Sequence, residues 1–321
     1  MSKYKIATLI CSIVTVLVLI GLVVWFLTSG AIGGWRGINI NIGGGTENLT
    51  GPFEQVGSES VSPAGIDRID IDWTAGEVLV VPHGAAEIIV TEYAQRELSG
   101  SEEFHVRVEG NTLRISFTEQ TFRTGRQPMK RLQVLVPAEL SESLEALLIG
   151  TVSAEITVSD IIAERLDAGS TSGAIEVNGA FQRADLSSIS GAVRMENTAV
   201  NSRLDASTTS GSMNISGSFD RADASSVSGT INLSGTFNRL DAGSTSGAVS
   251  VRSETIPELI DISTVSGSVT IYLPDTGEAI SVNHSSVSGR LTSDIPHTIG
   301  GGRAQIDVST VSGSTRILAL N

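Results

Sequence analysis

The sequence is short of cysteine, aromatic residues and basic residues. It has one cysteine in 321 residues, 4% aromatic residues, and 21 basic residues against 35 acidic ones. A single cysteine excludes an internal disulfide framework and a multi-cysteine metal site. The resulting net charge of −14 excludes the basic footprint with which proteins neutralise nucleic-acid phosphates. We therefore expect no nucleic-acid partner.

Large side chains for an ordinary core are also scarce, yet 40% of the residues are hydrophobic. That share is too high for a disordered chain. A sequence of small residues with 34 glycines needs another source of order, and internal repetition is the first to test.

One uncharged hydrophobic run, IATLICSIVTVLVLIGLVVWFL, covers residues 6–27. A helix of this length crosses about 30 Å of hydrocarbon. Lys3 and Lys5 precede the run, so the positive-inside rule places residues 1–5 in the cytoplasm and the C-terminal part outside the cell. We predict an uncleaved, single-pass transmembrane helix in the cell membrane. A cleaved signal peptide is the alternative, although its hydrophobic region is usually shorter.

Three further segments differ in composition. Residues 28–65 are rich in Gly, Asn, Ser and Thr and are predicted to form a flexible spacer. Residues 66–150 indicate an N-terminal β section, with a hairpin that turns at Gly110-Asn111. Residues 151–321 carry a regular repeat.

The repeat centres on a Ser-Gly pair that occurs eight times at spacings of 18 to 24 residues, in phrases such as LDAGSTSGAIEV and ADASSVSGTINL. Apolar residues alternate with period two on both sides of the pair, which is typical of strands that meet at a corner. Such short units bury their apolar faces only by stacking, as parallel strands about 4.8 Å apart.

We therefore predict an all-β fold, a single-stranded β-solenoid (β-helix) of about nine coils of 18–24 residues. The N-terminal β section would be its wider start, and the transmembrane helix would precede it. An antiparallel sandwich or a propeller is the alternative for an all-β chain. Handedness does not follow from the sequence.

Equivalent residues of successive copies should line the interior. Small residues fit a narrow coil, and aromatic residues should stack as an internal ladder. The alanines are Ala168, Ala206, Ala224 and Ala242, and the phenylalanines are Phe181, Phe219 and Phe237, with an interruption at Val200. The sequence does not show whether the strand at Arg316–Leu320 is capped, so end-to-end pairing at this edge stays open.

An aspartate occupies the same outward position in seven copies, and Asn283 occupies it in another. In five copies an arginine lies two residues earlier, on the same face of the strand. We expect a surface lattice of arginine and aspartate that neutralises itself; calcium bound between aspartates is the alternative. The lattice residues are Arg165, Asp167, Arg183, Asp185, Arg203, Asp205, Arg221, Asp223, Arg239 and Asp241, and the aspartate row continues at Asp261 and Asp307.

Serine and threonine also recur beside each corner. We expect these hydroxyls to bind corner backbone groups, with contact to sugars or ordering of ice as alternatives. We predict no catalytic, cofactor-binding or metal-binding residues. The four histidines are widely spaced, and the Gly-Ser-Thr-Ser-Gly segment at 169–173 lacks the strand–turn–helix context of a nucleophile elbow.

Three features together resemble a known family. They are the segment IDIDWTAGEVLVVPHG followed by a hairpin, the Val-Pro element at Val134–Pro137, and the Ser-Gly-x-Ile-x-Val units. Over residues 66–321 the chain resembles a bacterial domain-of-unknown-function family labelled putative adhesin, whose members carry an N-terminal membrane anchor. The resemblance implies a surface role and offers no catalytic residues. Some relatives are similar to envelope-stress accessory proteins.

We therefore predict a membrane-anchored, extracytoplasmic β-solenoid that acts as a surface binding or adhesion-type module of the cell envelope. Its partner would be an envelope polymer or a membrane or surface protein, and it would need no cofactor. The alternative is an envelope-stress accessory or sensor protein that works through a membrane partner. A polysaccharide-active enzyme is less favoured because most turns are too short to wall a cleft.

Overall fold

The computed structural model describes residues 52–118, 128–277, 279–299 and 304–320. These residues form strands and, as the one helix among them, the single turn α2 (Ala138–Ser141). The strands are β1 (Glu54–Val61), β2 (Arg68–Trp73), β3 (Gly76–His83), β4 (Ile88–Ala94), β5 (His105–Glu109), β6 (Thr112–Ser116), β7 (Lys130–Pro137), β8 (Leu144–Thr151), β9 (Glu155–Ser170), β10 (Ile175–Ser188), β11 (Val193–Thr208), β12 (Met213–Ser226), β13 (Ile231–Ser244), β14 (Val249–Ser253), β15 (Leu259–Thr264), β16 (Val269–Pro274), β17 (Ile280–Ser286), β18 (Leu291–Ser293), β19 (His297–Thr298), β20 (Gln305–Thr310) and β21 (Thr315–Leu320).

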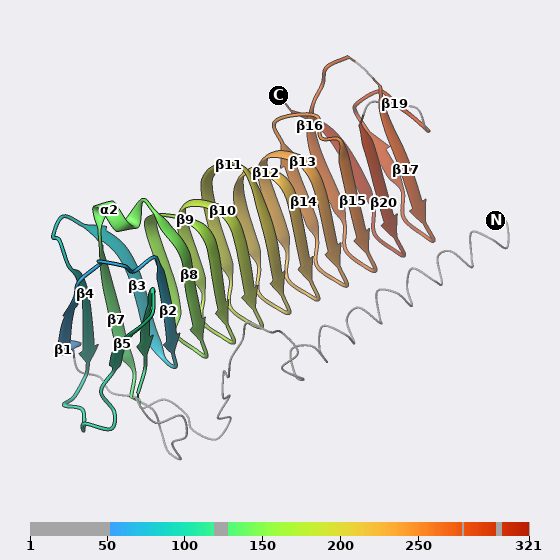
Figure 1. Ribbon diagram of the computed structural model, residues 1–321. Helices are drawn as coiled ribbons and strands as arrows, with labels where there is room; N and C mark the ends of the chain where they lie inside the picture. The colour runs from blue at the N-terminus through green and yellow to red at the C-terminus, as the bar shows by residue number, and fades with distance from the viewer. Residues whose placement is uncertain (1–51, 119–127, 278, 300–303, 321) are drawn as a thin grey trace. The chain divides into compact units, whose positions relative to one another are not determined.

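The middle of the chain is a stack of parallel coils, so the predicted all-β solenoid is confirmed. Strands β9 to β13 lie side by side in parallel (Figure 1), and each of β10 to β13 runs from one Ser-Gly corner to the next. Each residue lies opposite its equivalent in the next repeat, as Asp167 does opposite Asp185. The sequence period is therefore the length of one coil.

Inward side chains of neighbouring rungs compensate for one another in size. One inward row alternates Leu166, Ala184, Leu204, and the next inward row begins with Ala168 and Leu186. A large residue in one row thus accompanies a small one two residues away, which fills a narrow interior at native density. The predicted inward alanines, Ala168, Ala206, Ala224 and Ala242, are all buried.

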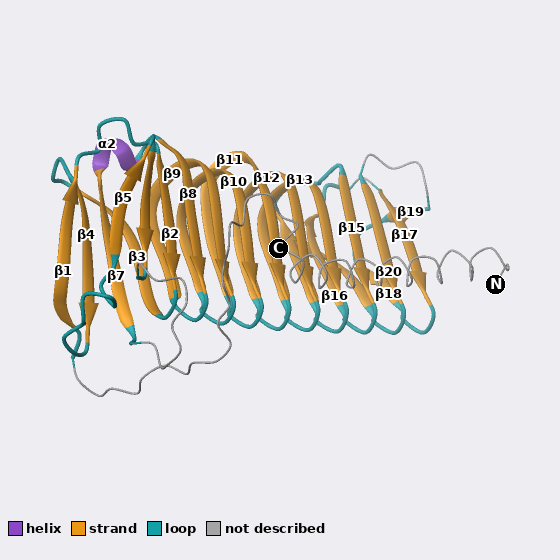
Figure 2. Cartoon of the chain, turned by 60° about the horizontal axis from the view of Figure 1, so that its bottom comes forward, coloured by secondary structure: helices purple, strands orange, loops and turns teal. Residues whose placement is uncertain are grey.

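Each Ser-Gly corner packs its glycine against the glycine of the neighbouring coil. A Cβ on Gly191 would lie 1.9 Å from the carbonyl oxygen of Gly173, and one on Gly229 would lie 1.8 Å from that of Gly211. Such distances leave no space for any side chain. The row of corner loops is visible along the lower edge of Figure 2. The glycines in the column, in spatial order, are Gly173, Gly191, Gly211, Gly229, Gly247, Gly267, Gly313 and Gly289.

The aromatic ladder is present, but its interruption was assigned to the wrong residue. Phe219 and Phe237 are buried and stacked, with ring centroids 5.8 Å apart, and Phe181 is also buried. Val200 is 67% exposed and therefore does not lie in the ladder. Ser202 lies opposite Phe219, and buried Asn197 bonds both the N–H and the carbonyl of Phe181. The longer coil leaves the regular register here, which turns Val200 outward.

The N-terminal section departs from the sequential order of coils. Strand β2 lies between β6 and β8, and β3 lies between β7 and β9, all in parallel. The predicted hairpin is confirmed as β5 and β6, with Gly110 at a φ of 64°. Strands β1 and β4 add antiparallel strands outside β7. Residues 54–61 were assigned to the spacer, but they form β1, because Val61 and its neighbours complete the ladder beside β4.

The C-terminal end reverses the sequential order as well. Strand β20 lies between β15 and β17, and β21 lies between β16 and β18. The question left open at Arg316–Leu320 is thereby answered in part: β16 pairs with β21 along its whole length, and β18 covers its other side over Thr315–Ile317. The outermost coil consists of β17 and β18, with β19 beside the start of β17.

The predicted transmembrane segment 6–27 lies outside the described residues. Among the residues that the structure describes, no helix has the length and hydrophobicity needed to span a bilayer.

The corner column predicts a sharp difference between two glycines. Gly229→Ala forces a Cβ against the carbonyl of Gly211 and should lower the free energy of unfolding by about 3 kcal/mol or more. Gly243→Ala is the matched control, since its Cβ would meet only Ser263 Oγ at 3.7 Å. Chemical denaturation of both variants measures the difference; equal losses would contradict the corner packing.

Candidate functional site

The predicted arginine and aspartate rows lie in register on one outward side of the coils. Arg165 Nη2 lies 3.0 Å from Asp167 and 3.2 Å from Asp185, so one guanidinium links two coils. Arg183 pairs with Asp185 at 3.1 Å. Arg221 binds both carboxylate oxygens of Asp223, at 2.7 and 2.9 Å. The geometry in these coils is that of charges neutralising one another; a role for the lattice in binding stays a prediction.

The lattice is not continuous: among the described residues Arg203 and Asp205 form no ion pair, and the pairing changes again toward the C-terminus. Arg239 pairs with Glu258 at 3.1 Å instead of with Asp241. Within the described ranges, Asp241 and Asp261 have no ion pair. Partial burial and the neighbouring aspartates raise the pKa of both carboxyl groups. At the end of the row, Asn283 takes the place of an aspartate and its Nδ2 donates a 2.8 Å hydrogen bond to Asp307. One repulsive contact between carboxylates is thereby absent.

The structure brings no metal-binding set together. In the described part of the chain, no group of three or more His, Cys, Asp or Glu side chains has a geometry suited to a metal ion. The calcium alternative therefore has no ligand set among these residues.

The corner hydroxyls serve the backbone, as predicted. Ser170, Ser226 and Ser244 each accept a 2.8 Å hydrogen bond from the corner glycine N–H three residues later. Thr208 and Thr264 instead donate to the carbonyl of their corner glycine, at 2.8 and 2.9 Å. These hydroxyls are buried, and an external ligand would have to break a corner to reach them.

A shallow groove of about 260 Å³ lies on another side of the coils, along the first halves of β12 and β13 and along β14. Asn232 Nδ2 donates a 2.8 Å hydrogen bond to Asn214 Oδ1. This bond leaves the amide nitrogen of Asn214 and the Oδ1 of Asn232 for other partners. We call this surface the Asn/Ser groove. Its side chains are Asn214, Ser216, Asn232, Ser234, Ser250 and Arg252.

Apart from Arg252 at one end, the Asn/Ser groove is an uncharged stretch within rows that are charged elsewhere. In the preceding coils, Glu176 and Arg194 occupy the row of Asn214, and Glu196 occupies the row of Ser216. On the other side of the groove, the row of Ser216 and Ser234 continues with Arg252 in the next coil and Tyr272 in the one after it. The change from charged to uncharged residues is visible in the sequence, because these outward residues alternate with the buried ones directly after each Ser-Gly pair.

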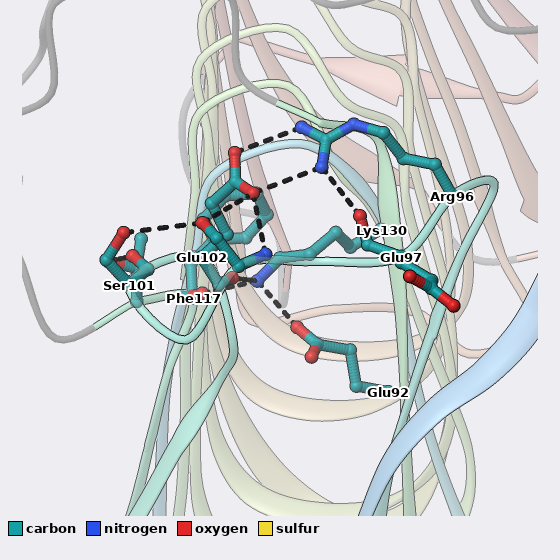
Figure 3. Close-up of polar contacts among 9 residues, drawn as sticks. Glu92, Arg96, Glu97, Ser101, Glu102, Phe117 and Lys130 are labelled. Atoms are coloured by element: carbon teal, nitrogen blue, oxygen red, sulfur yellow. Dashed lines mark hydrogen bonds and ion pairs between the residues drawn. The ribbon is translucent and has the colours of Figure 1, made fainter.

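The N-terminal section holds a buried ion pair that the sequence analysis missed (Figure 3). Lys130 Nζ lies 2.5 Å from Glu92 Oε1, and both side chains are fully buried. The ammonium group also donates to the carbonyls of Glu102 and Phe117 and lies 3.8 Å from the centroid of the Phe117 ring. Burial raises the pKa of Glu92, and the nearby Lys130 opposes that shift.

This pair fixes the loop between β4 and β5. Phe104 N donates to Glu92 Oε2 at 3.3 Å, and Arg96 binds both carboxylate oxygens of Glu102, at 3.0 and 3.1 Å. Since the charges of Lys130 and Glu92 are inaccessible to solvent, this pair can hold the loop against the end of the core but lies out of reach of a ligand.

Comparison of the sequence with family models identifies the family. The family described as Toastrack DUF4097, a domain of unknown function, matches residues 66–318. The chain belongs to this family. The resemblance to a bacterial domain-of-unknown-function family is thereby confirmed. No curated protein matches the Toastrack chain.

The solved structures that match this Toastrack protein have low sequence identity to it. A crystal structure named "Putative lipid binding protein" from Parabacteroides distasonis ATCC 8503 has 14% identity and a TM-score of 0.52, and the match covers 87% of this chain and 99% of that one. A "putative adhesin" from the same organism has 12% identity and a TM-score of 0.41, over 85% and 99% of the two chains. At such identity the first structure shows a shared fold.

Removing an unpaired aspartate should stabilise the protein. The raised pKa of Asp241 means that the folded state holds this proton more tightly than the unfolded state, so stability falls as pH rises above the usual Asp pKa. Asp241→Asn should therefore raise the free energy of unfolding at pH 7 by about 0.5 kcal/mol, and the gain should disappear near about pH 4.

Urea denaturation at several pH values measures this effect. Asp223→Asn is the control, because it removes the partner of Arg221 and should bring no gain. No gain from Asp241→Asn at pH 7 would show that the row is not under repulsive strain, and a gain of equal size in both variants would show that the ion pair with Arg221 does not offset the repulsion.

Breaking the buried ion pair should be costly. Lys130→Met leaves Glu92 buried without its cation and should lower the free energy of unfolding by about 3–5 kcal/mol, much of which the double variant Glu92→Gln/Lys130→Met should restore. Arg131→Met, on the same strand, removes an exposed pair with Glu77 and should cost less than about 1 kcal/mol. Thermal unfolding of the three variants provides the comparison; a double variant no more stable than Lys130→Met would contradict the account.

Proposed function

We propose that the protein is a surface binding module of the cell envelope whose ligand is a neutral, hydroxyl-rich polymer. The observation that carries this proposal is the Asn/Ser groove. Amide and hydroxyl side chains both donate and accept hydrogen bonds, so they match the hydroxyl groups of a polysaccharide. No ion pair has to be broken to reach them, unlike in the lattice of Arg165 and Asp185.

Charge favours a neutral ligand over an anionic one. The chain carries a net charge of −14, which disfavours association with polyanions. Of the three charged residues that precede the groove in its rows, Glu176 and Glu196 are acidic and Arg194 is basic, so the approach carries a net negative charge. Arg252 at the other end of the groove supplies a planar donor that binds hydroxyl oxygens as well as carboxylates.

The geometry of the stack suits an extended polymer. Equivalent side chains such as Asn214 and Asn232 lie on adjacent parallel strands, about 4.8 Å apart. A pyranose ring has a similar length, so successive sugars of a chain lying along the stack would meet successive rungs. Tyr272, which follows Arg252 in its row, offers an aromatic face at the end of the groove, of the kind that sugar rings pack against.

The proposal places this module outside the cell, with residues 6–27 as a transmembrane anchor and residues 1–5 in the cytoplasm. The hydrophobic run and the two lysines before it support this arrangement. An anchored module would hold an envelope polymer beside the membrane. The proposal requires no catalytic step and no cofactor.

Binding of the full chain to a glycan array, followed by titration with the best neutral polysaccharide, tests the proposal. The double variant Asn214→Ala/Asn232→Ala should weaken binding about tenfold, since it removes two amides that each contribute about 1 kcal/mol or less. The control is Asn238→Ala, because Asn238 is an exposed amide that bonds Asp220 at 3.0 Å and lies outside the groove.

An array that shows no binding, or equal weakening by Asn238→Ala, would contradict the proposal. Preferential binding of acidic glycans would contradict the charge argument. Failure on the array together with co-purification of a membrane signalling protein would favour the sensor alternative.

A further inference from the structure

The two ends of the stack differ in how their strand edges are protected. At the C-terminal end, β17 pairs along its length with β20 on one side. On its other side, β19 pairs only with Ile280 and Ser281. In the described part of the chain, no strand covers β17 beyond Ser281, and in Figure 1 β17 is the last long strand of the stack.

The outer side of β17 presents backbone hydrogen-bonding groups. Residues of an edge strand direct their N–H and C=O groups alternately toward the sheet and away from it. Ile280 N–H donates outward, to the carbonyl of Pro296 at 3.2 Å, whereas Ser281 N–H donates inward, to Ala304. His284 and Ser286 have the same parity as Ile280, so their backbone groups face the open side.

The open edge lacks the features with which proteins usually block strand addition. Native edges carry charges, prolines or bulges, but β17 reads ISVNHSS and its register with β20 has no shift. The outward aspartate of the inner coils is Asn283 here. Val287, in the adjoining corner, is 56% exposed and adds apolar surface to this end.

The opposite end is protected. Its edge strand β1 contains Glu54 and Glu59 and a register shift between Gln55 and Gly57. The other edge strand there, β5, carries Arg107 and Glu109 within five residues. In a head-to-tail filament, β17 would have to pair with β1 or β5 of the next copy, and both of these edges are protected. The unprotected edge of β17 therefore fits a partner edge that is also unprotected.

We propose that two copies of this chain associate through β17, paired antiparallel with β17 of the partner about a two-fold axis at His284. In this register Asn283 lies opposite Ser285 and Val282 lies opposite Ser286, so no like charges meet. Pairing satisfies the outward backbone groups of His284 and Ser286. Because the same edge is used twice, the contact closes on itself and stops at a dimer. This proposal is independent of the polysaccharide-binding function.

Sedimentation of the full chain in detergent micelles tests the dimer. The wild type should sediment as a dimer whose dissociation depends on concentration. In the double variant Asn283→Lys/Ser285→Lys, the lysine at 283 of each copy would face the lysine at 285 of the other copy. The resulting repulsion should make this variant monomeric under the same conditions. Ser263→Lys/Ser309→Lys is the matched control, because it adds the same charge in the same outward row as Ser285 on inner coils, and it should stay dimeric.

Amide hydrogen exchange of the wild type provides a second measurement that needs no variant. The amides of His284 and Ser286 should exchange at least tenfold more slowly at a concentration where the dimer forms than at one where it dissociates. A monomeric wild type would overturn the proposal, as would a dimer that persists in Asn283→Lys/Ser285→Lys. Masses that grow beyond two copies, or protection at β1 in place of β17, would also overturn it.

Discussion

Contact between corner glycines of neighbouring coils is the constraint on which the structure depends. At each corner the Cα of one glycine lies so close to the carbonyl of the next that a Cβ would come within 1.8–2.0 Å of the oxygen. Backbone contact at the corners therefore determines the distance between neighbouring coils. Corner hydroxyls such as Ser226, which binds Gly229 N–H at 2.8 Å, complete the hydrogen bonding there. The Ser-Gly pair thus recurs for steric and polar reasons.

Close stacking at the corners turns every coil position into a row along the molecule. Inward rows become a continuous core, in which Phe219 and Phe237 stack at 5.8 Å. Outward rows become surfaces whose chemistry depends on one residue per coil. The row of Arg165 and Asp167 is occupied by its own ion pairs, whereas in the row of Asn214 and Asn232 the bond between the two amides leaves one amide nitrogen and one amide oxygen for other partners. The surface of such a fold can therefore change along a row while the corners stay the same.

The repeat predicted most of the fold, because period-two patterning and the Ser-Gly pair determine register locally. The inward alanines, the Phe219–Phe237 stack and the corner hydroxyl bonds followed from that pattern. The order of the coils at both ends did not, since β20 and β17 carry nearly equivalent phrases and either could follow β15. The alternation places Glu92 on the face of Val90 and Lys130 on the face of Leu132, but nothing local in the sequence brings these two charges together, so the buried pair was missed.

The most direct test of the stacking account is the identity of the neighbour of β15. Ser263 lies opposite Ser309, and Ser309 lies opposite Ser285. The Cα atoms of each such pair are about 4.8 Å apart, which is within the range of a disulfide. Ser263 and Ser285 are separated by two strand spacings, which is beyond that range. In a Cys11→Ser background, the account predicts that Ser263→Cys/Ser309→Cys forms an intramolecular disulfide and that Ser263→Cys/Ser285→Cys does not. The reverse result would show sequential coils and contradict the order of the corner contacts.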